Sequence, residues 1–216
     1  MSHPQIHLPT QHALHGMGSP LPDGMHYFPE LLGEDEEAAL VALIAALPLH
    51  EAIYKGYTAK RRIASYGTQY DFDANELQRG EPLPDALRPL ADRARMLLQH
   101  TASADGVEPP RFTNALVAEY QPGTPLGWHR DVPDFESIVG FSLQGRACMR
   151  LRRYPPVNPR RNPALSVELP PRSAYVLRGE ARWAWQHCIA ETTELRYSIT
   201  FRTPAVRPRL APRLAS

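Results

Sequence analysis

The spacing of apolar residues divides the chain into an early part with helical periodicity and a later part with short, strand-like segments. Residues 34–47 are predicted to form a helix, because acidic side chains fill its first turn and Pro48 ends the pattern. A second helix is predicted within 84–99, where four apolar residues recur three or four positions apart. Both helices are expected to act as scaffold.

From Arg111 onward the apolar segments become short and are separated by Pro and Gly. The predicted strands are 114–120, 138–143, 148–153, 165–169, 174–177 and 196–203. Several short strands at such spacing favour a sandwich or a double-sheet jelly roll over an alternating βαβ fold. We therefore predict an α+β, mainly β protein with helices before a jelly-roll core.

The last of these strands alternates strictly between polar and apolar residues. Arg196, Ser198, Thr200 and Arg202 fall on one face, and Tyr197, Ile199 and Phe201 fall on the other. Such a polar face usually lies on the surface, which would make both arginines solvated charges. Alternatively it lines a barrel mouth, where guanidinium groups form planar forks for carboxylates. In that case a small diacid is the expected ligand.

The length and composition fit one catalytic domain. A chain of 216 residues with 43% hydrophobic content can bury a full core. Segments 1–24 and 204–216 are rich in proline and lack periodicity, so we expect flexible ends around a single domain over 25–203. A formal net charge of +1 gives no global reason to expect nucleic acid, so local clusters of charge matter more.

Other features of the composition point to the cytoplasm. Cys148 and Cys188 are too few for a disulfide framework. No apolar run approaches the roughly 20 residues that a membrane span needs, and the N-terminus lacks the charged-then-apolar order of a secretion signal. We therefore expect a cytoplasmic protein without a membrane partner.

Two clusters of basic residues suggest contact with a polyanion. Segment 51–73 interleaves lysines and arginines with tyrosines, which suits the grip of a nucleic acid strand but also suits a solvated loop whose rings cover the sheet. The second cluster surrounds a proline-rich loop and comprises Arg150, Arg152, Arg153, Arg160 and Arg161. It is expected either to contact phosphates, which would make binding salt-dependent, or to be a solvated loop.

Three residues have the chemistry of a metal site. His129 and Asp131 are two positions apart, so on an extended segment both side chains project to the same side. His187 lies much later in the sequence, but the folding of a sheet can bring it next to His129 and Asp131. Two imidazoles and one carboxylate are what a mononuclear non-haem iron(II) site needs, because they leave the opposite positions open. On its own, His187 is equally well explained as a buried histidine that satisfies a hydrogen bond.

Three sequence motifs together resemble the AlkB family of Fe(II)- and 2-oxoglutarate-dependent dioxygenases. They are Tyr-Gln-Pro-Gly-Thr-Pro-Leu-Gly-Trp-His-Arg-Asp over 120–131, Trp-Gln-His ending at His187, and Arg-Tyr-Ser-Ile-Thr-Phe-Arg over 196–202. The resemblance covers about 111–203 and implies a double-stranded β-helix, a jelly roll, as the core. It also implies that the preceding segment 51–73 forms a nucleotide-recognition lid.

The resemblance further implies a set of site residues. His129, Asp131 and His187 would bind Fe(II). Arg196 would pair with the distal carboxylate of 2-oxoglutarate with help from Tyr120 and Ser198, and Arg202 would lie toward the metal. The family couples O2-dependent oxidation of 2-oxoglutarate to succinate and carbon dioxide with hydroxylation of an N-methyl group, which then leaves as formaldehyde.

The chain departs from the AlkB pattern at two positions. Many members carry Asn two residues before the tyrosine, where its amide helps the co-substrate's carboxylate, and this chain has Ala118. We expect Arg202 or a water to take that role. An acidic residue after the metal-binding Asp is replaced by Pro133. The candidate substrate contacts are Tyr66, Tyr70, Arg62 and Asp134, with the two tyrosines as ring contacts for a base removed from its stack.

The favoured function is oxidative dealkylation of N-alkylated bases in nucleic acid, in DNA repair or on RNA, by a monomeric enzyme. Two alternatives come from other classes. An AlkB-like hydroxylase or demethylase of a protein or another target is motivated by the near-neutral charge and by Pro133. A binding module without catalysis is disfavoured, because all three candidate metal ligands and both arginines are present.

Overall fold

A computed structural model describes residues 21–54, 57–71, 76–102, 110–156 and 164–205. Most of the predicted flexible ends, 1–24 and 204–216, lie outside this description, as do Phe72, Arg160 and Arg161. Two antiparallel sheets make up the core of the described chain. The predicted fold class, mainly β with few helices and a jelly-roll core, is confirmed.

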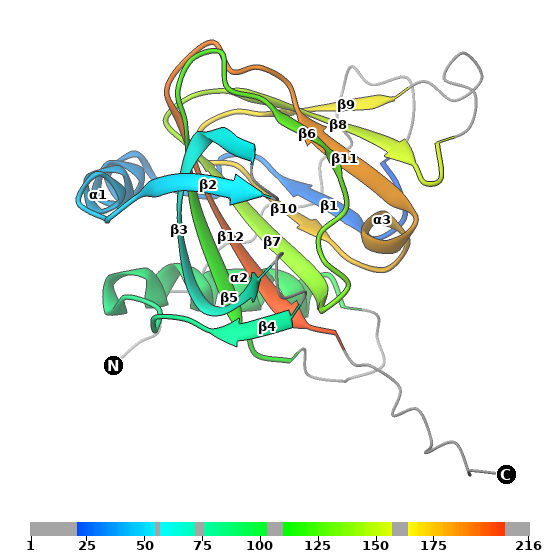
Figure 1. The fold of residues 1–216 in the computed structure, drawn as a ribbon, viewed down its shortest axis with the longest axis horizontal. Helices are drawn as coiled ribbons and strands as arrows, with labels where there is room; N and C mark the ends of the chain where they lie inside the picture. The colour runs from blue at the N-terminus through cyan, green and yellow to red at the C-terminus, as the bar shows by residue number, and fades with distance from the viewer. Residues whose placement is uncertain (1–20, 55–56, 72–75, 103–109, 157–163, 206–216) are drawn as a thin grey trace, which may run out of the picture.

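The larger sheet has eight strands in the order β1-β10-β7-β12-β5-β3-β2, with β4 paired to β3. Its strands are β1 (Met25–Phe28), β2 (His50–Tyr54), β3 (Tyr57–Asp71), β4 (Glu76–Arg79), β5 (Asn114–Tyr120), β7 (Phe135–Leu143), β10 (Ala174–Leu177) and β12 (Arg196–Pro204). The central strand, β12, lies between β7 and β5 (Figure 1). Elements distant in the sequence therefore meet along β12.

The smaller sheet has four strands in the order β6-β11-β8-β9. They are β6 (Leu126–His129), β8 (Ala147–Arg153), β9 (Leu165–Leu169) and β11 (Trp185–Ile189). A hydrophobic cluster joins the two sheets, with Met149, Leu151, Val167 and Ile189 from the small sheet and Ile138 and Leu177 from the large one. The sheets thus enclose an interior between their facing sides.

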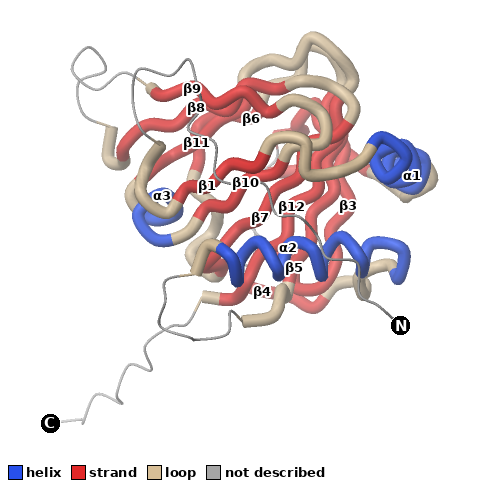
Figure 2. Tube along the Cα trace, turned by 180° about the vertical axis from the view of Figure 1, so that it is seen from behind, coloured by secondary structure: helices blue, strands red, loops and turns tan. Residues whose placement is uncertain are grey.

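Three α-helices and a short 3-10 helix, η1 (Asp85–Leu87), accompany the sheets. They are α1 (Glu34–Ala45), α2 (Arg88–His100) and α3 (Gly179–Trp183), and the first two match the predicted helices. Figure 2 shows α2 crossing the large sheet in front of β7, β12 and β5. A second hydrophobic cluster lies between α1, η1 and α2 and that side of the sheet. No helix in the described ranges is long and apolar enough to cross a membrane.

The alternation along β12 now has a physical explanation. Tyr197, Ile199 and Phe201 belong to the hydrophobic cluster on the helix side of the large sheet. The polar face therefore points toward the small sheet, and Arg196 is only 1% exposed. The interpretation of this face as solvated surface is wrong, because helices cover one side of the strand and the second sheet covers the other.

Segment 51–73 contributes most of β2 and all of β3, which extend the large sheet beyond β5. Arg62 to Gly67 pair with Glu119 to Asn114. The described part of this segment is thus regular sheet and not a solvated loop. Its role as a lid over a nucleotide stays a prediction, and the side chains of Tyr54 and Tyr57 lie outside the described structure.

Candidate active site

The three candidate metal ligands meet where the small sheet faces the large one. His129 ends β6 and lies directly opposite His187 of β11, so that sheet pairing brings the two histidines together. Their ring centroids are 4.3 Å apart. Asp131 follows two residues after His129, and its Oδ1 lies 3.5 Å from His129 Nε2 and 3.8 Å from His187 Nε2. One ligand atom from each residue lies within 4.8 Å of the others.

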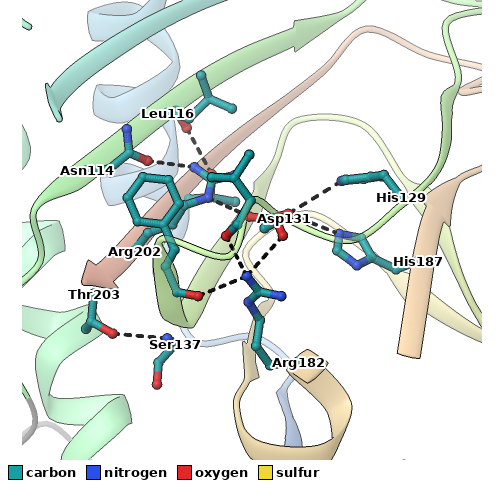
Figure 3. Close-up of polar contacts among 12 residues, drawn as sticks. Asn114, Leu116, His129, Asp131, Ser137, Arg182, His187, Arg202 and Thr203 are labelled. Carbon is teal, nitrogen blue, oxygen red and sulfur yellow. Dashed lines mark hydrogen bonds and ion pairs between the residues drawn. The ribbon is translucent and has the colours of Figure 1, made fainter. Parts of the chain in front are cut away.

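The second oxygen of Asp131 is held by an arginine. Arg202 Nε donates to Asp131 Oδ2 at 2.6 Å, and Arg202 Nη1 donates to Asn114 Oδ1 at 2.8 Å. Figure 3 shows Arg202 on one side of Asp131 and both histidines on the other. Because Oδ2 is engaged by Arg202, Oδ1 is the oxygen presented to the histidines.

The hydrogen bond of His129 selects the tautomer that binds a metal. Its Nδ1 lies 2.9 Å from the carbonyl oxygen of Gly127. A carbonyl only accepts, so Nδ1 carries the proton and the lone pair resides on Nε2, which faces Asp131. Metal-binding histidines commonly donate their other ring N–H to a carbonyl or carboxylate in this way.

The charge states of the other two ligands also suit a metal. Burial, together with the neighbouring His129 and arginines, lowers the pKa of His187 to about 3, so its imidazole is neutral at pH 7. Burial raises the pKa of Asp131, but Arg202 and the two histidines outweigh it and hold the pKa well below its usual range. The site therefore presents the neutral imidazole of His187 and the carboxylate of Asp131 beside the His129 ring.

These residues fit Fe(II). One ligand atom from each of the three residues lies within 4.8 Å of the others, so small side-chain movements suffice to bring all three to the bond lengths of about 2.0–2.2 Å that nitrogen and oxygen ligands adopt. Two histidines and one carboxylate on one side of the ion leave its other positions open, as in the non-haem Fe(II) oxygenases.

Arg182, in α3, fixes the loop that contains Asp131. Its Nη2 donates to the carbonyl oxygens of Asp131, Val132 and Phe135 at 3.1, 2.8 and 2.9 Å. The side chain is 3% exposed and lies below Asp131 in Figure 3. One buried guanidinium thus joins three backbone carbonyls of the loop between β6 and β7. Nothing in the sequence marked Arg182 as part of the site, because its partners are carbonyls on another segment.

A cavity extends from the triad along the polar face of β12. Arg196, Ser198, Thr200 and Arg202 all line it, together with Tyr120 of β5. Arg196 Nε donates to Ser142 Oγ at 3.1 Å, and its guanidinium carbon lies 4.9 Å from the centre of the Tyr120 ring. Arg196 Nη1 is buried and has no hydrogen-bond partner among the described residues. A buried guanidinium with a donor to spare suits a carboxylate ligand.

The comparison with protein families agrees with this geometry. Residues 24–202 match the model of the 2OG-Fe(II) oxygenase superfamily. The chain belongs to this superfamily. Its iron site and its 2-oxoglutarate site follow from that membership, and the His129–Asp131–His187 triad supplies the metal ligands.

Relatives place the chain among the AlkB-like members of the superfamily. It is 28% identical over 184 residues to an Arabidopsis thaliana protein named alkylated DNA repair protein ALKBH8 homolog, covering 77% of this chain and 50% of that protein. It is 26% identical over 172 residues to the Macaca fascicularis tRNA (carboxymethyluridine(34)-5-O)-methyltransferase ALKBH8, covering 78% of this chain and 24% of that protein. The chain therefore spans at most half the length of these two relatives.

A solved structure supports the fold. The structure of OsALKBH1 superimposes with a TM-score of 0.62 at 18% sequence identity, and the match covers 86% of this chain and 99% of that one. At this identity the likeness shows the fold alone.

Tyr175 is a cavity residue that the sequence analysis did not identify. It is buried on β10, opposite Gly140 of β7, and its side chain lines the cavity of this oxygenase. A Cβ at Gly140 would overlap the Tyr175 ring. Burial raises the pKa of Tyr175 well above its ordinary value, so the hydroxyl stays protonated. The signal in the sequence was a glycine inside a strand, which marks a close approach of another group.

The structure does not bring two of the candidate substrate residues to the cavity. Tyr66 is 8% exposed and packs in the hydrophobic cluster on the helix side of the large sheet, so it cannot stack on a base at the metal. Arg62 pairs with Glu119 through two hydrogen bonds of 2.8 Å, on the face of β3 that points away from the triad. Both predictions failed because strand alternation turns these side chains to the other face.

The other two candidates lie near segment ends. Tyr70 is partly buried near the end of β3, opposite Leu77 of β4. Asp134 is partly buried just before β7, and its carbonyl accepts from the Ala205 amide at 2.8 Å. Substrate contact by either side chain stays a prediction.

Proposed function

We propose that this oxygenase removes alkyl groups from the nitrogen atoms of bases in nucleic acid. The support beyond family membership is a set of arginine–aromatic pairs on the small sheet, whose strands β6 and β11 carry the two histidine ligands. An enzyme acting on a base must hold it outside the stack and grip the adjoining backbone. Cations and rings on the sheet that carries both histidines can supply the grip on the backbone.

The pairs are close and involve both strands that flank the metal. Arg152 and Arg150 of β8 lie over the Trp128 ring, with their guanidinium carbons 4.2 and 6.0 Å from its centre. Arg153 lies 5.1 Å from the centre of the Trp185 ring. Trp128 precedes the ligand His129 directly, and Trp185 is two residues before the ligand His187.

A third pair extends this surface. Arg130 lies 3.9 Å from the centre of the Tyr154 ring, and that ring is 42% exposed. Aromatic rings that face solvent beside arginines can stack bases while the arginines contact phosphates. Arg153 has a second partner, Glu180 at 2.9 Å, so part of its charge is compensated within the protein.

The arginines around Trp128 have a different position: Met149 and Leu151 point into the interior, so Arg150 and Arg152 lie on the outer face of the small sheet. They can hold the backbone of a nucleic acid strand but do not reach the base at the metal.

The names of the relatives agree with a nucleic acid substrate. One is named for repair of alkylated DNA and the other for modification of tRNA. On this proposal the triad binds Fe(II), and Arg196 and Tyr120 bind 2-oxoglutarate. When bound, these two supply the oxidation: 2-oxoglutarate and O2 give succinate and carbon dioxide, and one oxygen atom enters an N-methyl C–H bond. The hydroxymethyl product then releases formaldehyde and leaves the free base nitrogen.

The test is turnover of defined lesions. Anaerobically purified protein is supplied with Fe(II), 2-oxoglutarate, ascorbate and O2, and then with single-stranded DNA or RNA carrying 1-methyladenine, 3-methylcytosine or an etheno adduct. Mass spectrometry of the oligonucleotide should show loss of the alkyl group, and His187→Ala should abolish that loss. Tight oligonucleotide binding should fall with added salt, and Arg152→Gln should weaken it.

A different pattern would point to the alternative substrate class. If every lesion stays intact while succinate still forms, the nucleic-acid proposal is wrong and the oxygenase assignment stands. Succinate formation stimulated by proteins of a cell extract, and not by oligonucleotides, would then identify a protein substrate.

A further inference from the structure

Arg61 of β3 is a second arginine at the end of the cavity where Arg196 lies. Pairing of β3 with β5 sets Arg62 opposite Glu119, which places Arg61 beside Tyr120. Pairing of β5 with β12 sets Tyr120 opposite Arg196. Three adjacent strands therefore bring Arg61, Tyr120 and Arg196 to one end of the cavity, and all three line it.

The direction of the Arg61 side chain follows from strand alternation. Its neighbour Arg62 points to the opposite face, where Nε and Nη2 donate to the two carboxylate oxygens of Glu119. Consecutive side chains of a strand point to opposite faces, so Arg61 points into the space between the sheets. The partly exposed Arg62 and the cavity-lining Arg61 thus have different roles despite being adjacent.

The charge at this end of the cavity is unbalanced within the protein. Arg61 Nε and Arg196 Nη1 are both buried without a hydrogen-bond partner among the described residues. Among the described residues that line the cavity, Asp131 is the one carboxylate, and Arg202 already engages it at the other end of β12. Arg196 is buried and Arg61 is partly buried, and these two guanidinium groups with donors to spare form a site for an anion, because buried donors need acceptors.

The third arginine of the cavity lies at its other end. Arg202 donates to Asp131 beside the metal ligands and to Asn114 (Figure 3). Arg61 and Arg196 are therefore the two arginines placed to bind one anionic group at the end away from the triad.

We infer that Arg61 donates to the distal carboxylate of 2-oxoglutarate, together with Arg196. Arg61 lies beside Tyr120, and Tyr120 lies opposite Arg196, so both guanidinium groups are at the same end of the cavity. A guanidinium fork matches the planar shape of a carboxylate. This assignment rests on the co-substrate of the superfamily and holds whether the substrate is a nucleic acid or a protein.

The test is direct binding of two ligands that differ at the distal end. Isothermal titration calorimetry of Mn(II)-loaded protein, without O2, measures the dissociation constants of 2-oxoglutarate and of 2-oxopentanoate, which lacks the distal carboxylate. Arg61→Gln should weaken 2-oxoglutarate about 10- to 100-fold, the range for one hydrogen bond to a charged group. It should change the constant for 2-oxopentanoate less than about twofold, because that ligand has nothing for Arg61 to bind.

Matched variants separate this role from a general disturbance of the sheet. Arg62→Gln, one residue along the same strand, should leave both constants within about twofold. Arg61→Lys keeps the charge without the fork, so its loss should be intermediate.

Three results would overturn the assignment. One is an unchanged affinity of Arg61→Gln for 2-oxoglutarate. Another is equal weakening of both ligands by Arg61→Gln or by Arg61→Lys, which indicates a distorted site. The third is unchanged 2-oxoglutarate binding with reduced oligonucleotide binding, which would make Arg61 a substrate contact. Since calorimetry needs no substrate, a failure of the nucleic-acid proposal leaves this test unaffected.

Discussion

At the scale of single residues, the site is organised around the two oxygens of one carboxylate. Asp131 presents Oδ1 to the histidines while Oδ2 receives Arg202 at 2.6 Å. Arg202 also donates to Asn114, across the pair formed by β12 and β5. The carboxylate is thus fixed by the large sheet, whereas the histidines belong to the small sheet. Its orientation depends on protein contacts that exist before any metal binds.

Gly140 is a residue whose only evident role is to leave space. We predict that Gly140→Ala pushes the Tyr175 ring into the co-substrate cavity, since a Cβ at that position would overlap the ring. The KM for 2-oxoglutarate should rise about tenfold or more, and the free energy of unfolding should fall by about 1–3 kcal/mol. Steady-state succinate formation and urea unfolding measure the two effects.

The matched control is Gly127→Ala, because no atom lies within 4 Å of a Cβ at Gly127. That variant should keep the KM and the stability of the parent protein. The double variant Gly140→Ala/Tyr175→Ala removes the overlap, so its KM should equal that of Tyr175→Ala alone. A Gly140→Ala protein with an unchanged KM would show that the ring moves elsewhere.

The residues that the sequence identified are those carried by motifs. His129, Asp131 and His187 were recognised by type and spacing, and sheet pairing brings them together. Arg182 and Tyr175 were missed, since each acts through a neighbour that is remote in the sequence. Arg62 and Tyr66 were misplaced, because knowing that a segment is extended does not say which face of it points to the site.

At the scale of elements, prediction succeeded where alternation or helical periodicity was strong. The strict pattern of β12 predicted the strand, and only the structure showed that both faces are covered. The strands β1 and β6 were missed because four residues are too few to show a clear alternation of apolar and polar positions. β11 was also missed, because its first residues, Trp-Gln-His, contain no run of apolar residues that would predict a strand.

The short helix α3 has a larger effect than its five residues suggest, because Arg182 joins it to the loop after Asp131. We predict that Arg182→Gln lowers the free energy of unfolding by about 2–4 kcal/mol, since hydrogen bonds from a charged donor contribute about 1.5–3 kcal/mol each and act here as a group. Affinity for Fe(II) should fall about 10- to 100-fold as the carboxylate loses its orientation. Chemical denaturation and competition with a metal chelator measure these effects.

An arginine on the other side of α3 provides the control. Arg153 also contacts this helix, through Glu180 at 2.9 Å, but its side chain is 55% exposed. An exposed ion pair contributes about 0–1 kcal/mol, so Arg153→Gln should leave stability and metal affinity almost unchanged. Equal losses in the two variants would mean that α3 as a whole, and not the carbonyl contacts of Arg182, supports the loop.

At the scale of the whole molecule, the two sheets bury charges that a hydrophobic core would exclude. Arg196, Arg202 and Asp131 lie inside, where removal from water is costly unless partners compensate. The helix side of the large sheet, by contrast, is an apolar cluster. The fold therefore has one apolar side that stabilises it and a polar interior that forms the active site. The stability of the protein should depend on the protonation of the ionisable side chains in that interior.

This dependence gives a prediction for the metal-free protein. The pKa of His187 in the folded state is about 3, below the ordinary value of 6.5, so between these values the unfolded chain binds more protons. Stability is therefore full above pH 6.5 and falls as the pH drops, by up to about 1.4 kcal/mol per pH unit from this one group. The pKa of Asp131 is also lowered, so its protonation further reduces the free energy of unfolding at still lower pH.

Urea unfolding in a chelator from pH 7 to pH 4 should show the decline in the free energy of unfolding, and His187→Gln should flatten it. Because other histidines titrate in both proteins, the difference between the two curves isolates His187, and parallel curves would contradict its burial as a neutral imidazole.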